Sequence, residues 1–502
     1  QMYYKFAECK LFIPINSYSI YVNSYLLFTF VHYKINRNYK IMSTLTIGII
    51  VVFVLGYAFI AMESLIKINK AAIALLMFVF CWVLYMVDPA PFVQLMHPDF
   101  KGTGEQVLSF VNSLITEHLG DTATTLFFLM GAMTIVEIVD QNGGFNWVKN
   151  VMHSKTKRSL LWKIAFMTFF LSAILDNLTT SIVMVMILRK LVHDKKDRMI
   201  YASLVIIAAN SGGAFSPIGD VTTIMLWNAG MITAGGVISE IFIPSLLSMI
   251  IPALLLQTAL KGNIEYDDMG TDLMGDTVVL EFTALQRKLI FAIGVGGLCF
   301  VPLFHYLTEL PPFVGILLVL GILWSVTELF YRHMHRRRGD NIQFSKRVSN
   351  LLSRIDMSTI LFFLGILMAV ACLEEVGVLH ELGGGLNSFF KGNHYAVTGI
   401  IGVLSSIVDN VPLVAGSMGM YPVQATGDMA VDGIFWQLLA YCAGVGGSIL
   451  IIGSAAGVVV MGLEKITFGW YMKKISWLAF LGYLCGILFY WVIRTFIFTT
   501  PL

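Results

Sequence analysis

The stretch LSAILDNLTTSIVM, residues 171–184, carries an Asp-Asn pair in the middle of an otherwise apolar run. The stretch SSIVDNVPLVAG, residues 405–416, carries a second such pair. These pairs divide two apolar runs, 160–188 and 395–420, into halves of ~15 residues, or ~22 Å as helix, whereas a hydrocarbon core is ~30 Å thick. We therefore predict two re-entrant hairpins, the first at 160–188 and the second at 395–420, each with an Asp-Asn pair at its tip.

The remainder of the chain has the composition of a membrane protein. Of its 502 residues 57% are hydrophobic and only 13% are charged, and the mean hydropathy is +0.78. An ordinary soluble domain carries about a quarter charged residues, so this chain could not cover a water-facing surface. Hydrophobic runs predict further full-length spans at 45–62, 70–88, 122–139, 200–229, 237–260, 286–307, 311–331, 357–378, 434–462 and 472–498. The predicted fold class is an all-α polytopic membrane protein, with about ten transmembrane spans plus the two re-entrant hairpins.

Residues 1–41 differ in composition from the rest. They are rich in Tyr, Asn, Lys and Ile without a sustained period, and Met42 opens the apolar stretch MSTLTIGIIVVFVLGY. We interpret 1–41 as a non-native upstream leader; a signal peptide is less favoured because no small-residue cleavage site follows the apolar run near 25–31. The six cysteines are scattered singly, so neither a disulfide framework nor a zinc site is predicted.

Positively charged residues gather on one side of the predicted topology. Alternation of the spans places the segments 149–163, 189–198 and 332–354 on the same face, and each is rich in Lys and Arg. The opposite face, from Met42 on, has only Lys101 and Lys391 in its connecting loops. Cytoplasmic loops carry the excess of positive charge, so the three basic segments are predicted to be cytoplasmic. The first hairpin then enters from the cytoplasm and the second from outside.

The chain also contains an internal repeat. Three pairs of segments match at offsets between 233 and 235 residues. They are DTATTLFFL at 121–129 with DMSTILFFL at 356–364, ILDN at 174–177 with IVDN at 407–410, and NSGGAFSPIGD at 210–220 with GVGGSILIIGS at 444–454. An odd number of spans separates the copies, so the second copy is predicted to cross the membrane inverted. Inverted repeats with broken helices are typical of secondary transporters, whose sites lie near the midplane.

These features predict an organisation in five parts. They are the leader 1–41, N-terminal scaffold spans in 42–120, a first inverted repeat in 121–285 with hairpin 160–188, central spans and a basic cytoplasmic loop in 286–355, and a second inverted repeat in 356–502 with hairpin 395–420. The chain from Met42 would then begin and end outside, as a multi-pass protein of a bacterial inner membrane.

The hairpin tips are the strongest candidates for ion binding. A charged side chain at the centre of a membrane helix costs ~2.5–3.5 kcal/mol and usually marks an ion or proton path. Asp176 and Asp409 occupy equivalent tips, and each is followed by an asparagine, Asn177 or Asn410, whose amide oxygen can ligate a cation. The alternative is that each Asp caps the following half-helix. Because Ser or Asn would cap at lower cost, ion binding is the favoured interpretation.

Further oxygen ligands are predicted around the tips. Paired glycines and Pro217 should break the span 200–229 and free backbone carbonyls, although glycines also serve close helix packing. The remaining candidates are Thr179, Thr180, Ser211, Gly212, Gly213, Ser216 and Asp220 in the first copy, and Ser448 and Ser454 in the second. A Na⁺ site is predicted at Asp176, Asn177, Ser216 and Asp220. Glu137 is a candidate for the proton path or else is solvated, and solvation is also expected for Glu374 and Glu375.

At these residues the sequence resembles the NhaD-type sodium/proton antiporters of the ion-transporter superfamily, which also holds divalent-anion/sodium symporters and arsenite permeases. The resemblance extends over 42–502 and is strongest in LDNLTTSIVM, NSGGAFSPIGDVTTIMLWNAG and VDNVPLVAGSMGM. It implies exchange of Na⁺ or Li⁺ for H⁺, no cofactor besides these ions, a scaffold beside a mobile transport domain, and a homodimer. Dicarboxylate members have Ser-Asn-Thr at both tips, where the aspartates of this chain would repel a dicarboxylate and attract Na⁺.

Two other functions are alternatives to antiport. A permease for a neutral metalloid hydroxide would use the same fold without sodium. An intramembrane aspartyl protease also needs two membrane aspartates, but Pro217 replaces the first Gly of its Gly-x-Gly-Asp pattern and the repeat is left unexplained. The expected partners are therefore the lipid bilayer, sodium and protons, with no nucleic acid. Asp176 has more oxygen ligands nearby than Asp409, so we expect Asp176 to bind the cation and Asp409 to act as an isolated proton carrier.

The predicted topology can be tested by labelling. In a background in which all six cysteines are replaced, a cysteine at Arg337 should react only from the cytoplasm, and one at Lys391 only from outside. The reason is that 332–354 and 391 fall on opposite faces of the inverted repeat. Reaction of both cysteines from the same face with a membrane-impermeant reagent would contradict the topology.

Overall fold

The computed structural model describes 44–62, 66–145, 148, 151–152, 154–264, 282–338, 351–352, 355–407 and 409–496. The predicted leader 1–41 lies outside the described residues, and so does Met42. The chain divides into two units, 1–48 and 49–502, and the packing described below concerns the second unit.

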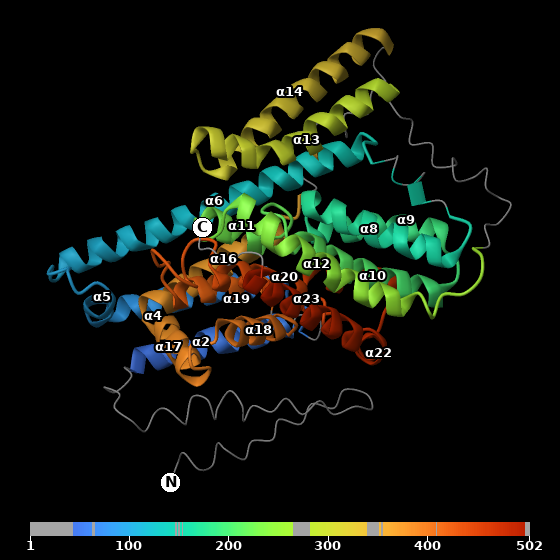
Figure 1. The fold of residues 1–502 in the computed structure, drawn as a ribbon. Helices are drawn as coiled ribbons and strands as arrows, with labels where there is room; N and C mark the ends of the chain where they lie inside the picture. Colours follow the sequence, from blue (N-terminus) through green and yellow to red (C-terminus); the bar gives the residue numbers. More distant parts are fainter. Residues whose placement is uncertain are drawn as a thin grey trace. The chain divides into compact units, whose positions relative to one another are not determined.

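The described part of the chain is almost entirely helical (Figure 1). Its helices are α2 (Thr44–Ala61), α4 (Lys70–Val87), α5 (Ala90–Met96), α6 (Glu105–Gln141), α8 (Lys157–Leu175), α9 (Asn177–Leu191), α10 (Lys195–Ala214), α11 (Val221–Asn228), α12 (Ala234–Leu256), α13 (Ala284–Thr308), α14 (Pro312–Arg338), α16 (Met357–Glu375), α17 (Val378–Phe389), α18 (His394–Ser405), α19 (Asn410–Met420), α20 (Ile434–Gly446), α21 (Ala455–Glu464), α22 (Phe468–Lys474) and α23 (Ser476–Phe496). Within these ranges only two isolated β-bridges occur, and no strand.

Eight described helices are long and apolar enough to cross a membrane: α4, α6, α8, α12, α13, α14, α16 and α23. This confirms the predicted class of all-α polytopic membrane protein. The spans predicted at 200–229 and 434–462 are each broken into two helices, α10 with α11 and α20 with α21. The first half of the first hairpin is longer than predicted, because α8 has 19 residues. It starts at Lys157, so a basic first turn extends the apolar part of the helix.

The helix α6 is also longer than its predicted span, 122–139. It has 37 residues, or ~55 Å, well beyond the ~30 Å of a hydrocarbon core. Its first half carries polar residues such as Glu117 and His118, which kept it out of the hydrophobic run. The predicted division at 120/121 therefore falls inside one continuous helix, and that at 285/286 falls inside α13. The helices α13 and α14 pack on each other and on α6 (Figure 1).

The first hairpin returns to the end from which it starts. Its two helices, α8 and α9, join at Asp176, whose backbone has φ 80° and ψ 158°. Both open ends lie at the start of α10, where the Tyr201 hydroxyl donates to the carbonyl of Lys157 at 2.8 Å. Nearby, Arg198 donates to the carbonyl of Val192 at 3.0 Å. The two helices therefore form a hairpin, as predicted for 160–188, with its tip at Asp176.

The second hairpin has the same relation to α20. Phe435, near the start of α20, contacts the ring of His394 at the start of α18, with centroids 6.0 Å apart. It also contacts the ring of Tyr421, directly after α19, at 4.7 Å. The open ends of the second hairpin therefore both lie at the start of α20.

The two broken segments run in opposite directions. The segment α10–α11 starts at the open end of the first hairpin and leads to Thr233, whose N–H and hydroxyl donate to Asp432 just before α20. The segment α20–α21 starts at the open end of the second hairpin and ends at Glu464, which binds Arg189 near the end of α9. The antiparallel course of the two segments supports the predicted inversion of the repeat.

Equivalent side chains make equivalent contacts in the two copies. The hydroxyl of Ser172 in α8 donates to the carbonyl of Ala209 in α10 at 2.6 Å. The hydroxyl of Ser405 in α18 donates to the carbonyl of Ala443 in α20 at 2.8 Å. These pairs are related by the offset of 233–234 residues seen in the sequence. The repeat is therefore present in the tertiary hydrogen bonds as well as in the sequence.

Glycines let each hairpin approach its broken segment at backbone distance. A Cβ on Gly212 would lie 2.1 Å from the carbonyl oxygen of Phe169 in α8. A Cβ on Gly446 would lie 2.1 Å from the carbonyl oxygen of Gly402 in α18. No real Cβ tolerates such a distance, so close helix packing, the alternative raised for these glycines, accounts for Gly212.

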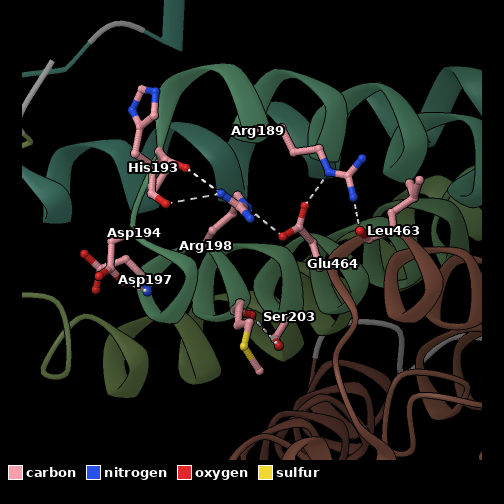
Figure 2. A network of polar contacts seen from close by, with 10 residues as sticks. Arg189, His193, Asp194, Asp197, Arg198, Ser203, Leu463 and Glu464 are labelled. Carbon is pink, nitrogen blue, oxygen red and sulfur yellow. Dashed lines mark hydrogen bonds and ion pairs between the residues drawn. The ribbon is translucent and has the colours of Figure 1, made fainter. Parts of the chain in front are cut away.

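A buried ion-pair network closes the open end of the first hairpin (Figure 2). The side chain of Glu464 is fully buried and lies 2.8 Å from Nε of Arg189 and 2.6 Å from Nε of Arg198. Arg198 also donates to the carbonyls of Val192 and His193. A buried carboxylate without partners would be strongly destabilising, so this network holds α9, α10 and α21 together.

The glycine contact predicts a matched pair of stability effects. Gly212→Ala should lower the unfolding temperature of the purified protein by several degrees, because the new methyl group must push α8 away from α10. Gly321→Ala in α14, where a Cβ meets nothing within 4 Å, should leave it unchanged or raise it slightly, because Ala favours helix over Gly by ~1 kcal/mol. Equal unfolding temperatures for the two variants in detergent would contradict the packing role.

Candidate functional site

The tips of the two hairpins meet at one carboxylate. Asp220 lies in the break between α10 and α11 and is only 2% exposed. The amide nitrogen of Asn177, at the tip of the first hairpin, donates to its Oδ2 at 2.8 Å. The amide nitrogen of Asn410, at the tip of the second hairpin, lies 3.3 Å from both of its oxygens. The structure thus brings together three predicted site residues from three separate segments.

The asparagine amides are turned differently from the prediction. We expected their amide oxygens to face a cation, but the nitrogens face Asp220. The reason is that an ionised carboxylate only accepts hydrogen bonds, so an amide beside it must present its N–H groups. In this arrangement Asp220 is held by donors from both hairpins.

The hydrogen bonds continue from Asp220 into the second repeat. Asn177 also donates to Oδ1 of Asn210 at 3.1 Å, and Asn210 donates to the hydroxyl of Ser454 at 3.0 Å. Ser454 occupies the repeat position of Asp220, and each caps the half-helix that follows it. Two equivalent breaks therefore face one site, one with a carboxylate and the other with a hydroxyl.

Asp176 caps α9, as the alternative interpretation of the tips had it. Its Oδ1 accepts from the backbone N–H of Thr179 at 2.9 Å and its Oδ2 accepts from the Thr179 hydroxyl at 2.8 Å. Asp356 makes the same two bonds to Thr359 at the exposed start of α16. A capping role alone therefore does not require a position at the tip of a hairpin, because Asp356 makes the same cap at an exposed helix start. Asp176 differs from Asp356 in its place at the tip, next to Asn177.

Asp409 does not cap its helix. No backbone N–H of α19 binds its side chain, and its Oδ2 instead lies 3.5 Å from Nζ of Lys70 in α4. The expectation of an isolated carboxylate is therefore wrong, because a lysine from another part of the chain accompanies it. Sequence reasoning missed Lys70 because it stands at the first residue of a span, where a lysine usually reaches water. Asp220 interacts electrostatically with both Asp176 and Asp409.

Hydroxyl groups of the first hairpin are buried behind the tip. Thr180 and Ser181 are both 0% exposed, and among the described residues neither hydroxyl has a hydrogen-bond partner. Such oxygens are available as hard ligands for a small cation. The Ser216 hydroxyl is already engaged, since it donates to the carbonyl of Ala173 at 2.5 Å. It also accepts from the backbone N–H of Ile218 at 3.4 Å, which leaves one lone pair for a further contact.

Other predicted ligands make contacts within or between helices instead. Ser211 bonds Ser248 of α12 at 2.8 Å, and Ser448 donates to the carbonyl of Val445 at 2.7 Å. A Cβ on Gly213 would lie 2.6 Å from the carbonyl oxygen of Gly219, so this glycine allows the chain to turn at the break. Glu137 is half-buried in α6, and the hydrogen bonds described above at the tips do not include it.

Besides Glu464, two further buried carboxylates outside the tips were not predicted. Glu375 is 6% exposed and lies 2.8 Å from His97 and 2.9 Å from His118, which corrects the expectation that it is solvated. Glu240 is 1% exposed and lies 3.2 Å from Arg494. Both acids have basic partners from other helices, which the sequence does not show.

Comparison with known proteins agrees with this architecture. The model of the citrate transporter family matches residues 57–439. Sodium/proton antiporter 1 of Arabidopsis thaliana is 42% identical over 91% of this chain and 74% of the relative. The Na⁺/H⁺ antiporter NhaD of Alkalimonas amylolytica is 28% identical over 87% of this chain and 88% of the relative. The solved YdaH transporter of Alcanivorax borkumensis has the same fold, with a TM-score of 0.54 and 12% identity over 84% of this chain and 98% of that one.

Broken helices facing one another across paired hairpin tips define a multi-pass membrane transporter, and the relatives are transporters rather than enzymes. The chain belongs to the citrate transporter family. The resemblance to the NhaD-type antiporters is confirmed by the relatives of that name.

Proposed function

We propose that the protein exchanges Na⁺ or Li⁺ for H⁺ across its membrane, and so extrudes sodium and regulates pH. The observation that carries the proposal is the meeting of both hairpin tips at Asp220, with a further carboxylate on each tip. Buried carboxylates with hard oxygen ligands bind small monovalent cations and protons. Relatives at 42% and 40% identity are named sodium/proton antiporters, which supports the same ions here.

The proposed Na⁺ ligands are Asp176, Asn177, Ser216 and Asp220, with the buried Thr180 hydroxyl next to them in α9. In the present arrangement Asn177 donates to Asp220. A cation at Asp220 would replace these N–H donors, so the Asn177 amide would have to turn its oxygen toward the ion. Sodium binding would thereby break a contact between the first tip and the break of α10–α11. This gives the ion a direct effect on the position of the hairpin.

Exchange follows if Na⁺ and H⁺ compete for the same carboxylates. Either ion neutralises an ionised acid, and only a neutralised tip can pass through a low-dielectric barrier at modest cost. Asp220 also repels the aspartates of both tips, and the three acids would repel an anionic substrate. Citrate, after which the family is named, is therefore disfavoured at these tips. No contact in the described residues favours a metalloid hydroxide over a cation.

The membrane, orientation and assembly are also proposed. The charge pattern supports a cytoplasmic position of the basic loops, with Met42 and the C-terminal end of α23 outside. Bacterial relatives named NhaD support a bacterial inner membrane, while the two relatives of highest identity given above are plant proteins. A homodimer is proposed from the family resemblance.

Ion flux tests the proposed function. Inside-out vesicles with an imposed acid interior should lose their proton gradient when NaCl or LiCl is added, because outward H⁺ movement would be coupled to inward movement of the cation. A pH-sensitive dye reports the gradient, KCl is the control salt, and vesicles lacking the protein give the background. No response to Na⁺ or Li⁺ from mildly acidic to alkaline pH would remove the antiporter proposal.

The two tips should respond differently to loss of charge. Asp176→Asn should abolish Na⁺ binding, because it removes the carboxylate at the start of the helix that carries the buried hydroxyls, while leaving an oxygen to cap α9. Asp409→Asn should retain measurable Na⁺ binding but stop coupled exchange. Calorimetric titration of the purified variants with NaCl measures binding.

The matched control is Asp356→Asn, which makes the same change in the same type of cap at an exposed helix start and should bind Na⁺ as the unmodified protein does. If Asp409→Asn alone eliminates Na⁺ binding, the roles of the two tips are reversed.

A further inference from the structure

Asp409 stands where its repeat partner caps a helix, but its side chain points elsewhere. Asp176 uses both carboxylate oxygens on Thr179, whereas Asp409 makes no side-chain cap on α19. The position equivalent to Thr179 is Pro412, which has neither a backbone N–H nor a hydroxyl to donate. The carboxylate of Asp409 is thus released from its helix by the local sequence. It points to Lys70, 3.5 Å away.

Lys70 is held in place by contacts of its own. It is the first residue of α4, whose cap Asn69 accepts from the backbone N–H of Ala71 at 2.8 Å. Asn69 also accepts from the hydroxyl of Ser358 in α16 at 2.9 Å, which fixes the start of α4 to that helix. The ammonium lies 4.2 Å from the centroid of the Phe362 ring, at cation–π distance. The lysine is therefore positioned by α4 and α16 rather than by the hairpin.

The pair lies in a restricted environment next to the proposed ion site. The side chains of Lys70 and Asp409 are 27% and 19% exposed. The residue after Asp409, Asn410, donates to Asp220. A cation that neutralises Asp409 therefore acts within one residue of the contact between the second tip and the central carboxylate.

We propose that Lys70 is a tethered cation that competes with Na⁺ for Asp409. Its ammonium occupies the carboxylate of the second tip, so that free Na⁺ binds only at the first tip. The two nearly identical Asp-Asn tips are thereby made unequal by a residue outside both repeat motifs. This inference rests on the proposed exchange of Na⁺ for H⁺, and it assigns to Lys70 the exclusion of Na⁺ from one of two candidate sites.

Counting bound sodium tests the inference. Lys70→Gln should increase the number of Na⁺ ions bound per chain by one, measured with radioactive ²²Na⁺ on the purified protein, because Asp409 loses its resident cation. The additional ion should disappear in the double variant Lys70→Gln/Asp409→Asn. Lys67→Gln, at an exposed lysine three residues earlier, should bind as the unmodified protein does. An unchanged number in Lys70→Gln overturns the inference.

A second variant tests the inference if Lys70→Gln does not fold. In it, the positive charge near Asp409 is removed by mutation and then restored by chemical modification. Lys70→Cys in the cysteine-free background should bind the additional Na⁺, and reaction with an aminoethyl thiosulfonate should remove it by placing an ammonium near Asp409 again. A neutral reagent of the same size should leave the additional ion bound; loss of the ion with both reagents contradicts the inference.

Exchange by the unmodified protein is measured in parallel. Its absence would refute the proposed function, whereas its presence with an unchanged Na⁺ count in both Lys70 variants would refute only the role of Lys70.

Discussion

The buried carboxylate of Asp220 is the constraint on which the rest of the site depends. A buried acid between helices must be surrounded by donors, and here those donors are the backbone N–H of Thr222 and the side-chain amides of Asn177 and Asn410, on two different hairpins. Both hairpins must therefore end at the same depth as the break in α10–α11. A change in the charge of Asp220 therefore changes the strength of its hydrogen bonds to Asn177 and Asn410 at the same time. The occupancy of one acid is thus linked to the positions of both hairpin tips.

The glycines and the ion-pair network explain how the tips reach Asp220. Gly212 and Gly446 remove the side chains that would keep α8 from α10 and α18 from α20. At the other end of the first hairpin, Glu464 ties α9 to α10 and α21 through two arginines (Figure 2). The hairpin is consequently fixed at its open end and packed along its length. Rearrangement that starts at the tip would have to move this assembly as a body or break contacts that are costly to lose.

The sequence predicts the parts of this arrangement that are encoded locally. An Asp-Asn pair within an apolar run and glycines beside Pro217 are local signals, so the hairpins and breaks could be predicted and paired through the repeat. The ion pair of Lys70 with Asp409 could not be, because 339 residues separate its members. The extension of α6 was missed for a related reason: its first half includes His118, which packs against Glu375 from another helix. The orientation of the asparagine amides depends on the carboxylate of Asp220 that accepts from them, and the sequence does not show that these residues are neighbours.

The asymmetry of the two repeats has a physical consequence for exchange. Asp220 is matched by Ser454, and Asp409 is accompanied by Lys70, whereas within the described residues the hydrogen bonds of the Asp176 side chain go to Thr179 in the helix that it caps. Fully ionised, the three acids and one ammonium leave two uncompensated negative charges, close enough to interact with one another. Each arriving Na⁺ or H⁺ removes one of these charges, so either ion relieves the same repulsion. A scaffold that is symmetric in its backbone but not in its charges can therefore present a cation site at one tip and a site already neutralised by lysine at the other. Equal tips would bind the same ions in the same way, and nothing in the site would then distinguish the two hairpins.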